Sequence, residues 1–215
     1  MADMAAIASI VSAGGTLVLA VATFGAVRSA NTAARTAERS LMAGLRPLLV
    51  QGRVGDPPSK VLWRDRHAVK IDGGRAYAAL GSEAVYLAMT LHNVGSGIAL
   101  LNCYYVHPEQ AFSNIPYADL DEFTRLTIDL YIPAGDAGYW EGAVRDVANP
   151  TYEPLAKVVD AREPFSVDLL YGDQEGGQRT ISRFGIRPYE EEGKWICSVT
   201  RHWSLEGPDP RADSH

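Results

Sequence analysis

The densest group of polar side chains in the sequence lies between Tyr171 and Arg179, in the segment YGDQEGGQR. Asp173 and Glu175 stand two residues apart with glycines behind them, so their carboxylates could present oxygen atoms to a cation. A calcium-binding loop needs more oxygen ligands at fixed intervals, and the EF-hand pattern is absent. A hairpin turn in which Asp173 bonds to the backbone explains the composition without a ligand. We therefore expect a turn, with Asp173, Glu175 and Arg179 as candidate contacts for a ligand or partner.

A second group of acids surrounds Tyr139 and Trp140 in the segment YIPAGDAGYWEGAVRD. Its acids are Asp136, Glu141 and Asp146. Acids that flank aromatic residues in a Gly-rich loop can bind sugars or form the acid pair of a glycoside hydrolase, provided that they converge in space within about 5–10 Å. The alternative is an aromatic residue that plugs the core beside a loop. Asp136, Trp140 and Glu141 are the candidate contacts taken from this segment.

Other reactive side chains do not form a recognisable catalytic or metal-binding motif. The segment Gly95-Ser96-Gly97 lacks the nucleophile elbow of the α/β-hydrolases, because Val94 occupies the first glycine position. Cys103 and His107 on one strand would lie about 13 Å apart, too far to bind one metal ion. The sequence contains neither a phosphate-binding Gly-rich loop nor a dinucleotide fingerprint. It therefore predicts no catalytic residue, no metal ligand and no cofactor.

An apolar segment near the N-terminus predicts a membrane anchor. Residues 5–27 contain no charged side chain, and as a helix they would be roughly 34 Å long, against a hydrocarbon core of about 30 Å. We expect a transmembrane helix over 5–27. A cleaved signal peptide is one alternative, but it would have a basic start and an apolar run of about 7–15 residues. A buried helix in a soluble protein is the other.

A juxtamembrane helix is predicted over 28–46, a stretch rich in Ala, Arg, Glu and Leu that ends at Pro47. The basic residues lie on this side of the span, and none precedes it. The positive-inside tendency then places the N-terminus outside the cell membrane and the C-terminal body in the cytoplasm, as a single-pass protein. The four residues that carry this charge are Arg28, Arg35, Arg39 and Arg46.

Small and apolar residues recur three or four positions apart in both helical segments. Such spacing lets two helices approach closely, so this region could self-associate or dock on another membrane protein. An Ala-rich sequence also produces these pairs by chance, and that alternative stays open. The candidate helix–helix contacts are Thr16, Ala20, Ala22, Ala26, Ala30, Ala34, Ala37 and Leu41.

Beyond Pro47 the alternation of apolar and polar residues predicts strands separated by tight turns. The pattern is clearest in AVYLAMTLHNV, PFSVDLLYG and KWICSVTRHWSL, and in the last of these Trp195, Cys197, Val199 and Trp203 are expected on one face. Further strands are predicted at 47–54, 60–63, 68–71, 75–80, 97–107, 130–133, 137–142 and 177–187. Glycines in the turns are expected to supply positive φ.

The expected fold class is mainly β: an antiparallel, immunoglobulin-like β-sandwich over 47–207 behind the two N-terminal helices. Short helical insertions are predicted at 117–129 and 151–162. The polar tail 208–215 is expected to be disordered.

Charge and cysteine content limit the class of partner and the compartment. The net charge is −6, and since the arginines lie beside the span, the body is more acidic than the whole chain. An acidic body argues against nucleic acid as a partner. Cys103 and Cys197 should be thiols if the body is cytoplasmic and would be the natural disulfide pair if it were exported.

The order of these features carries a resemblance. An apolar span, an Arg-bearing Ala-rich helix, then LHNVGSGIAL and LLYGDQEGGQRTISRF resembles a family of uncharacterised actinobacterial single-pass membrane-anchored proteins with a C-terminal β-sandwich domain. More loosely, the Asn-x-Gly-x-Gly-x-Ala and Tyr-x-Asp-x-x-Gly motifs are similar to sandwich domains behind single bacterial membrane helices. The resemblance implies a fold and carries over no activity.

The expected function is a membrane-anchored, non-enzymatic interaction module, either an accessory subunit or a scaffold of a membrane complex. Its expected partners are the lipid bilayer and another membrane protein or a second copy of itself. The alternative is a membrane-tethered hydrolase or carbohydrate-binding domain that uses Asp136, Glu141, Asp173 or Glu175.

Overall fold

The computed structural model describes residues 19, 22–38, 40, 41, 44–109, 115–189 and 193–206. The chain divides into two compact units, Met1–Ala43 and Gly44–His215. In the first unit, residues 19, 22–38, 40 and 41 are helical and exposed. Among the described residues, no helix combines the length and the apolar character that a membrane crossing requires. Most of the predicted span 5–27 and all of the tail 208–215 lie outside the described residues.

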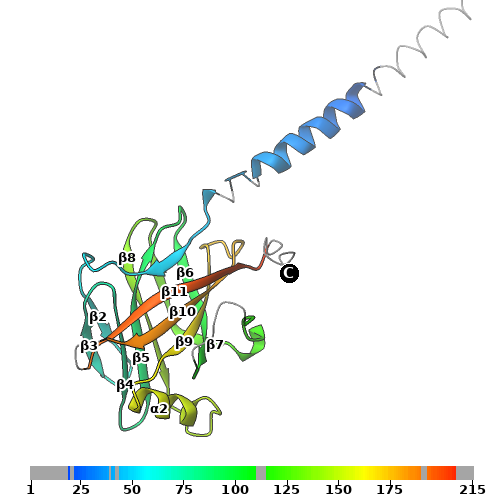
Figure 1. Cartoon of the computed structure of the whole chain (residues 1–215). Coiled ribbons are helices and arrows are strands. Elements are labelled where there is room, and N and C mark those ends of the chain that lie inside the picture. Colours follow the sequence, from blue (N-terminus) through cyan, green and yellow to red (C-terminus); the bar gives the residue numbers. More distant parts are fainter. Residues whose placement is uncertain are drawn as a thin grey trace, which may run out of the picture. The chain divides into compact units, whose positions relative to one another are not determined.

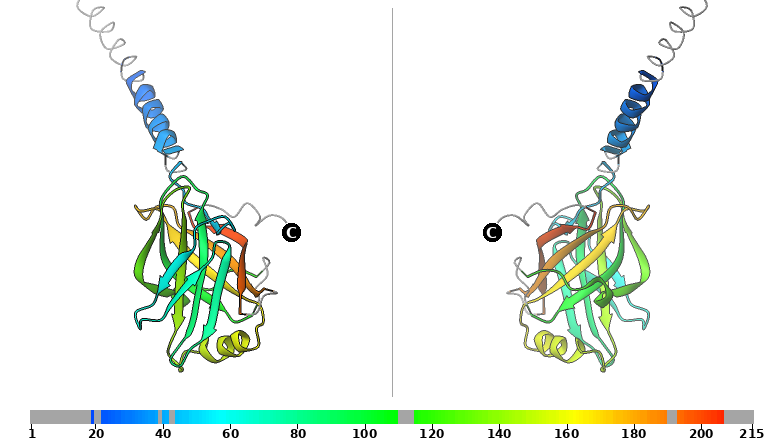
Figure 2. Two further views of the ribbon diagram at one scale, coloured as in Figure 1. Left: turned by 90° about the vertical axis from the view of Figure 1, so that its left-hand side faces the viewer. Right: turned by 90° about the vertical axis from the view of Figure 1, so that its right-hand side faces the viewer.

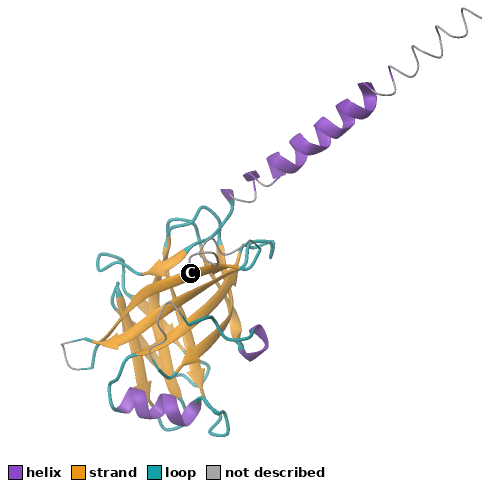
Figure 3. Cartoon of the chain, turned by 45° about the vertical axis from the view of Figure 1, so that its right-hand side comes forward, coloured by secondary structure: helices purple, strands orange, loops and turns teal. Residues whose placement is uncertain are grey.

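The second unit is built mainly of antiparallel β-strands, so the predicted mainly-β class is confirmed (Figures 1 and 3). One short 3₁₀ helix, Leu120–Glu122, and one α-helix, α2 (Tyr152–Asp160), interrupt them. The strands are β1 (Leu49–Gln51), β2 (Ser59–Leu62), β3 (Ala68–Ile71), β4 (Arg75–Leu80), β5 (Val85–Asn93), β6 (Ala99–His107), β7 (Thr124–Ile132), β8 (Ala137–Val144), β9 (Phe165–Gly172), β10 (Thr180–Pro188) and β11 (Trp195–Ser204).

A single curled sheet contains all strands except the β2–β3 hairpin. It runs in the order β8-β5-β4-β11-β10-β9-β6-β7, and β1 pairs with β5 beyond the end of β4. The pairing of β11 with β4 is limited to Trp195 and Ile196, where the sheet turns from one layer to the other. Figure 2 shows the strands wrapped around a common interior, with α2 at one end. This arrangement fits a β-sandwich, and its two outermost strands, β7 and β8, come close to each other.

The core lies between the two layers and is filled by alternate residues of the strands. Leu87 and Met89 of β5 and Trp140 of β8 meet Phe165 of β9 and Trp195 of β11 there, all fully or almost fully buried. Burying an aliphatic or aromatic side chain of this size contributes roughly 1.5–3 kcal/mol. The end of the core is closed by α2, whose amphipathic face buries Leu155 and Val159.

The opposite face of β5 is also covered, which explains why all nine of its residues are buried. The β2–β3 hairpin lays Val61, Trp63 and Ile71 over Tyr86 and Ala88. Because both faces of β5 are apolar, this strand lies at the centre of the unit and separates two hydrophobic clusters.

The helical insertion predicted over 117–129 is confirmed only as a single turn, whereas the one predicted over 151–162 corresponds to α2. Within 117–129 the chain forms only the 3₁₀ turn at Leu120–Glu122 and then enters β7. The residues of β7, TRLTIDLYI, include β-branched side chains that favour an extended backbone, and the strand pairs with β6 at both ends. This pairing overrides the helix-forming residues at the start of the segment.

A bulge in β11 also changes one predicted face. Phe184 of β10 pairs with Val199, but Arg183 pairs with Arg201, so Thr200 is an extra residue. The side chains beyond it therefore switch faces. Trp203 lies in a cluster with Ile181 on the outer face, not with Trp195 in the core.

The side chain of Asn93 ties three segments together at the end of β5. Its Nδ2 donates to the carbonyls of Gly97 (2.7 Å) and Ile132 (2.9 Å). Its Oδ1 accepts from the N–H groups of Leu48 (3.2 Å) and Gly95 (3.0 Å). The amide is fully buried, and all four of its hydrogen-bonding positions are satisfied.

The glycines after Asn93 are required for close approach, and not for the positive φ that the sequence suggested. A Cβ on Gly95 would lie 2.4 Å from the Arg46 carbonyl, and one on Gly97 would lie 1.7 Å from the Leu45 carbonyl. Neither residue has positive φ; in the described ranges the glycines with positive φ are Gly74, Gly135, Gly176 and Gly193. The motif Asn-x-Gly-x-Gly therefore forms the docking surface for the segment that leads into β1.

Replacing Asn93 by Ala is expected to lower the free energy of unfolding by about 3 kcal/mol, because it removes two buried and two partly buried hydrogen bonds to the main chain. Urea denaturation of the full chain, followed by tryptophan fluorescence, measures this change. The exposed Asn102 of β6 supplies the control, since Asn102→Ala should change stability by less than about 0.5 kcal/mol. Equal effects of the two substitutions would contradict the role given to Asn93.

Candidate functional site

Consecutive strands β7 and β8 are not paired with each other, although a short turn joins them. The turn continues the pairing of β8 with β5: the Asn93 N–H donates to the Asp136 carbonyl (3.0 Å), and the Gly135 N–H donates to the Asn93 carbonyl (2.9 Å). The Ile132 carbonyl, at the end of β7, is taken by the Asn93 amide. The two strands thus diverge from the turn and leave facing edges.

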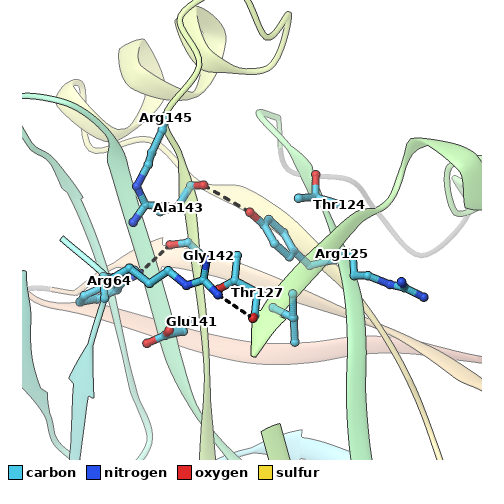
Figure 4. A pocket seen from close by; sticks show the side chains of 11 residues that line it. Arg64, Thr124, Arg125, Thr127, Glu141, Gly142, Ala143 and Arg145 are labelled. Atoms are coloured by element: carbon cyan, nitrogen blue, oxygen red, sulfur yellow. Dashed lines mark hydrogen bonds between the residues drawn. The ribbon is translucent and has the colours of Figure 1, made fainter. Parts of the chain in front are cut away.

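A cavity of about 100 Å³ lies where the two edges have separated (Figure 4). One wall is the start of β7, Thr124–Thr127, and the other is the end of β8 together with Arg145. Tyr104 of β6 and the turn between β2 and β3 complete the lining. The lining residues are Trp63, Arg64, Tyr104, Thr124, Arg125, Leu126, Thr127, Glu141, Gly142, Ala143 and Arg145.

Side chains take the place of the missing main-chain partners along this cavity. Arg64 Nη2 donates to the Thr127 carbonyl (3.1 Å), so the guanidinium reaches from the β2–β3 turn to β7. Trp63 Nε1 donates to the Gly142 carbonyl (3.1 Å). The Tyr104 hydroxyl donates to the Ala143 carbonyl at 3.4 Å. A closed sheet would satisfy such carbonyls with N–H groups of the neighbouring strand.

The carboxyl group of Glu141 is the least satisfied polar group in the cavity. Glu141 follows Trp140 on β8, so it points to the opposite face from the core and lies 9% exposed. Its Oε2 is buried and has no hydrogen-bond partner in the part of the chain that the structure describes. Burial raises the pKa of Glu141, and the charge of Arg145 offsets only part of this effect. A buried polar group without a partner is costly, and a bound ligand is one way to satisfy it.

The three arginines of the cavity are arranged differently. Arg64 crosses the cavity, whereas the guanidinium of Arg125 extends away from Glu141 (Figure 4). Arg145 forms an ion pair with Asp65 (3.1 Å) at the rim. Asp65 compensates the charge of Arg145. Arg64 and Arg125 form no ion pair with a described acid, and of these two Arg64 is the one that crosses the cavity.

The rim is held by an aromatic cluster on the β2–β3 turn. The Tyr86 hydroxyl donates to Asp65 Oδ2 at 2.6 Å. This bond is the main reason that the pKa of Asp65 falls to about 2; burial opposes it, and the His67 N–H and Arg145 add to it. The imidazole of His67 stacks on the Tyr86 ring at 4.1 Å and its Nε2 lies 3.0 Å from the Tyr77 hydroxyl. These contacts fix the turn that carries Arg64.

Among the residues predicted from the acidic segments, Glu141 lines the cavity and the others lie elsewhere. Trp140 is fully buried in the core, as the plain alternative suggested. Asp136 is exposed in the β7–β8 turn. The structure therefore separates Asp136 and Trp140 from the Glu141 carboxyl rather than gathering them around one ligand.

The segment between β9 and β10 forms the expected hairpin turn. Asp173 Oδ1 accepts the N–H groups of Glu175 (3.1 Å) and Gly177 (2.8 Å), so the carboxylate closes the turn. Arg179 pairs through Nε with Glu206 at 2.9 Å. Local structure thus accounts for Asp173 and Arg179, while Glu175 is exposed.

A second buried polar cluster lies on the outer face of β9 and β10. Arg183 Nε and Nη2 donate to the two oxygens of Asp168, both at 2.7 Å, and neither residue is exposed. His107 Nε2 lies 2.9 Å from Asp168 Oδ2. Burial alone would raise the pKa of Asp168, but the hydrogen bonds from Arg183 and His107 outweigh it and hold this pKa below its usual value.

The guanidinium of Arg183 also anchors a crossing segment. Its Nη1 donates to the Ile115 carbonyl (2.8 Å) and its Nη2 to the Pro116 carbonyl (3.1 Å). The Trp203 ring lies 5.0 Å from the guanidinium carbon. These contacts surround the Arg183 guanidinium. They give the cluster a structural role, because they fix the chain before β7 against the sheet.

The predicted helix–helix contacts fall in the first unit. Thr16 and Ala20 lie outside the described residues. The remaining candidates are helical and exposed: Ala22, Ala26, Ala30, Ala34, Ala37 and Leu41.

Metal-binding groups and a disulfide are absent from the described ranges. No cluster of three or more His, Cys, Asp or Glu side chains there could hold a metal ion. Cys103 and Cys197 are both free thiols, and burial raises the pKa of Cys197 to about 12.

The chain matches no family model, no curated protein and no solved structure. The site is therefore defined by its own geometry. Sequence reasoning identified Glu141 but missed Arg64, Tyr104 and Thr127, which come from three other strands or turns. An arginine in the turn between two short strands carries no local signal that it will reach a strand about sixty residues later.

Substituting Tyr86 with Phe is expected to raise the pKa of Asp65 from about 2 toward its ordinary value of 3.8. The phenol hydroxyl is the strongest of the groups that favour the ionised carboxylate. Carboxyl-detected NMR titration of the full chain measures the shift directly. Because the folded-state pKa lies below the unfolded value, the stability from Asp65 is present above about pH 4 and lost as the pH falls toward 2.

The matched control for this titration is Tyr77→Phe, which removes the hydroxyl bonded to His67 and leaves the Tyr86–Asp65 bond in place. The Asp65 pKa should then stay low. A low Asp65 pKa in the Tyr86→Phe variant would show that Arg145 alone is sufficient.

Replacing Glu141 by Gln is expected to raise the free energy of unfolding at pH 8, since it removes a buried charge without a partner. The folded-state pKa of Glu141 lies above the unfolded value of 4.5, so the destabilisation is absent below that value and grows as the pH rises through the folded-state pKa. Urea denaturation at pH 4 and pH 8 should therefore show a larger gain at pH 8.

The exposed Glu153, which pairs with Lys157 on α2, is the control for this measurement. Its pKa is lowered by the bond to Lys157, the opposite direction, so Glu153→Gln should give no gain at pH 8. A loss of stability in Glu141→Gln at pH 8 would mean that the carboxylate has a partner in the folded state.

Proposed function

We propose that this protein is a membrane-anchored, non-enzymatic interaction module that acts as an accessory subunit or scaffold of a membrane complex. The observation that carries the proposal is the open seam between β7 and β8, where strand edges and the unpartnered Glu141 carboxyl face one cavity. If β7 and β8 were paired with each other, the main-chain groups of their edges would be hydrogen-bonded within the sheet. Their arrangement favours a surface that a partner completes.

The membrane part of the proposal is supported by the sequence of residues 5–27, which carries no charge. The described helical residues 22–38 begin inside this span, and its last part presents large apolar side chains, including Phe24 (70% exposed) and Val27 (53% exposed). Apolar side chains at this level of exposure gain free energy from burial against lipid or another helix. A single-pass orientation with a cytoplasmic body follows from the arginines beside the span.

An immunoglobulin-like sandwich and membership of the actinobacterial membrane-anchored family belong to the same proposal. The curled antiparallel sheet and the docking motif LHNVGSGIAL are compatible with both. A tethered hydrolase or carbohydrate-binding domain is less well supported. Of the residues that line the cavity, Glu141 is the one acid, whereas glycoside hydrolysis uses a pair.

After high-speed centrifugation of lysed cells, the full chain is expected in the membrane pellet, and detergent but not 1 M salt should release it. Hydrophobic insertion resists salt, whereas electrostatic attachment is screened. Deleting residues 5–27 should move the chain to the supernatant. Full-length protein in the supernatant without detergent would contradict the anchor.

Chemical crosslinking in native membranes tests the interaction module itself. It should return one or a few specific protein partners or a homo-oligomer. The yield of the crosslinked product should persist when the membranes are diluted with excess lipid. Recovery only as an unassociated monomer at native expression level would overturn the proposed role, even if the anchor is confirmed.

A further inference from the structure

The cavity at Glu141 is one end of a longer groove. A second cavity of about 300 Å³ shares Tyr104 and Thr124 with it and continues past Tyr105 and Val144 to the residues before α2, Asn149–Thr151. Because both linings include these two residues, the two hollows adjoin, and together they are called the groove. The groove thus follows the starting half of β7 on one side and the final half of β8 on the other.

The shape of this groove suits an extended chain. Its two long walls are strand segments of four residues, Thr124–Thr127 and Glu141–Val144, and four residues in a strand span about 13 Å. Between the described strands no ladder joins these walls. Strand β7 pairs with β6 at Thr124–Arg125 and again from Leu130. Its middle residues, 126–129, lie outside this pairing.

The chemistry of the groove suits a polypeptide main chain, which offers N–H donors and carbonyl acceptors in alternation. The Glu141 carboxyl lacks a donor, and Arg64, whose charge is unpaired, can donate to an acceptor. Arg64 is exposed and donates a hydrogen bond to the Thr127 carbonyl, so a peptide N–H can replace it at small cost. The partly exposed Tyr105 adds aromatic surface for side chains of the peptide.

We propose that this groove binds an extended segment of a partner polypeptide, which adds as a strand between β7 and β8 and donates a hydrogen bond to Glu141. The segment completes the sheet with main-chain hydrogen bonds, as in other cases of strand addition. The proposal rests on the function proposed above and names the class of partner and the place where it binds.

The test uses the full chain in lipid nanodiscs and a displayed library of random twelve-residue peptides. Peptides that are enriched over empty nanodiscs are synthesised, and their Kd values are measured by fluorescence anisotropy. Each is also made with N-methyl groups at alternate positions, in two sets. Insertion between β7 and β8 predicts that each set loses binding at least tenfold, since alternate N–H groups of the inserted strand face the two opposite strand edges and each set of methyl groups removes the donors on one side.

Two variants locate the binding site. Thr127→Trp fills the groove and should weaken binding at least tenfold, whereas Ile128→Trp, on the next residue but outside the cavity lining, should stay within twofold. Glu141→Gln should weaken binding while it stabilises the fold, a combination that damage to the structure does not produce. Hydrogen exchange should show new protection at Thr127 and Ala143 when peptide is bound.

The proposal is overturned if no peptide is enriched, if either N-methyl set binds as well as the unmethylated peptide, or if Thr127→Trp binds as well as Ile128→Trp in protein of unchanged thermal stability. Inhibition by acetate or by methylammonium alone at millimolar concentration would also overturn it, because it would identify a site for a small ion. A partner that crosslinks to the chain in membranes but leaves the groove exposed to exchange would support the interaction module and refute the groove.

Discussion

The amide of Asn93 is the interaction on which the arrangement of the second unit depends. It joins the segment before β1, the loop after β5 and the end of β7 through four hydrogen bonds at a buried position. By taking the Ile132 carbonyl, it prevents β7 from pairing with β8 at their common turn. One side chain thus both closes one end of the core and starts the divergence that opens the groove at the other end of these strands.

The buried polar groups of the second unit form two kinds of environment. Around Arg183 and Asp168 every described donor and acceptor contact is short, both charges are buried, and the cluster holds the chain before β7 in place. Around Glu141 the opposite holds, since a buried carboxyl oxygen lacks a partner while side chains from β6 and the β2–β3 turn satisfy neighbouring carbonyls. A buried charge that is fully paired indicates a structural role, whereas one left open indicates a place for something else to bind.

Much of the fold could be predicted from the sequence, because period-2 alternation is a local property. It identifies β5 and β9 and the mainly-β class, and Asp173 marks the turn between β9 and β10. The prediction failed where long-range pairing decides the outcome. Segment 124–132 is a strand because β6 lies beside it, Trp203 changes face because of one extra residue in β11, and Gly97 is needed because Leu45 returns to contact it. Glu141 could be proposed from its neighbours, but Arg64 reaches the site only through the tertiary fold.

The single bond from Arg64 to the Thr127 carbonyl has a consequence for how the protein behaves at high concentration. An open strand edge is a template on which identical chains can stack, and natural proteins protect such edges with charge or irregular backbone. Here a guanidinium covers one carbonyl, and the middle of β7 departs from regular pairing. Both forms of protection are weak enough to be displaced. The available edge therefore also favours self-association of the protein. A high density of the protein on a two-dimensional surface would increase that self-association.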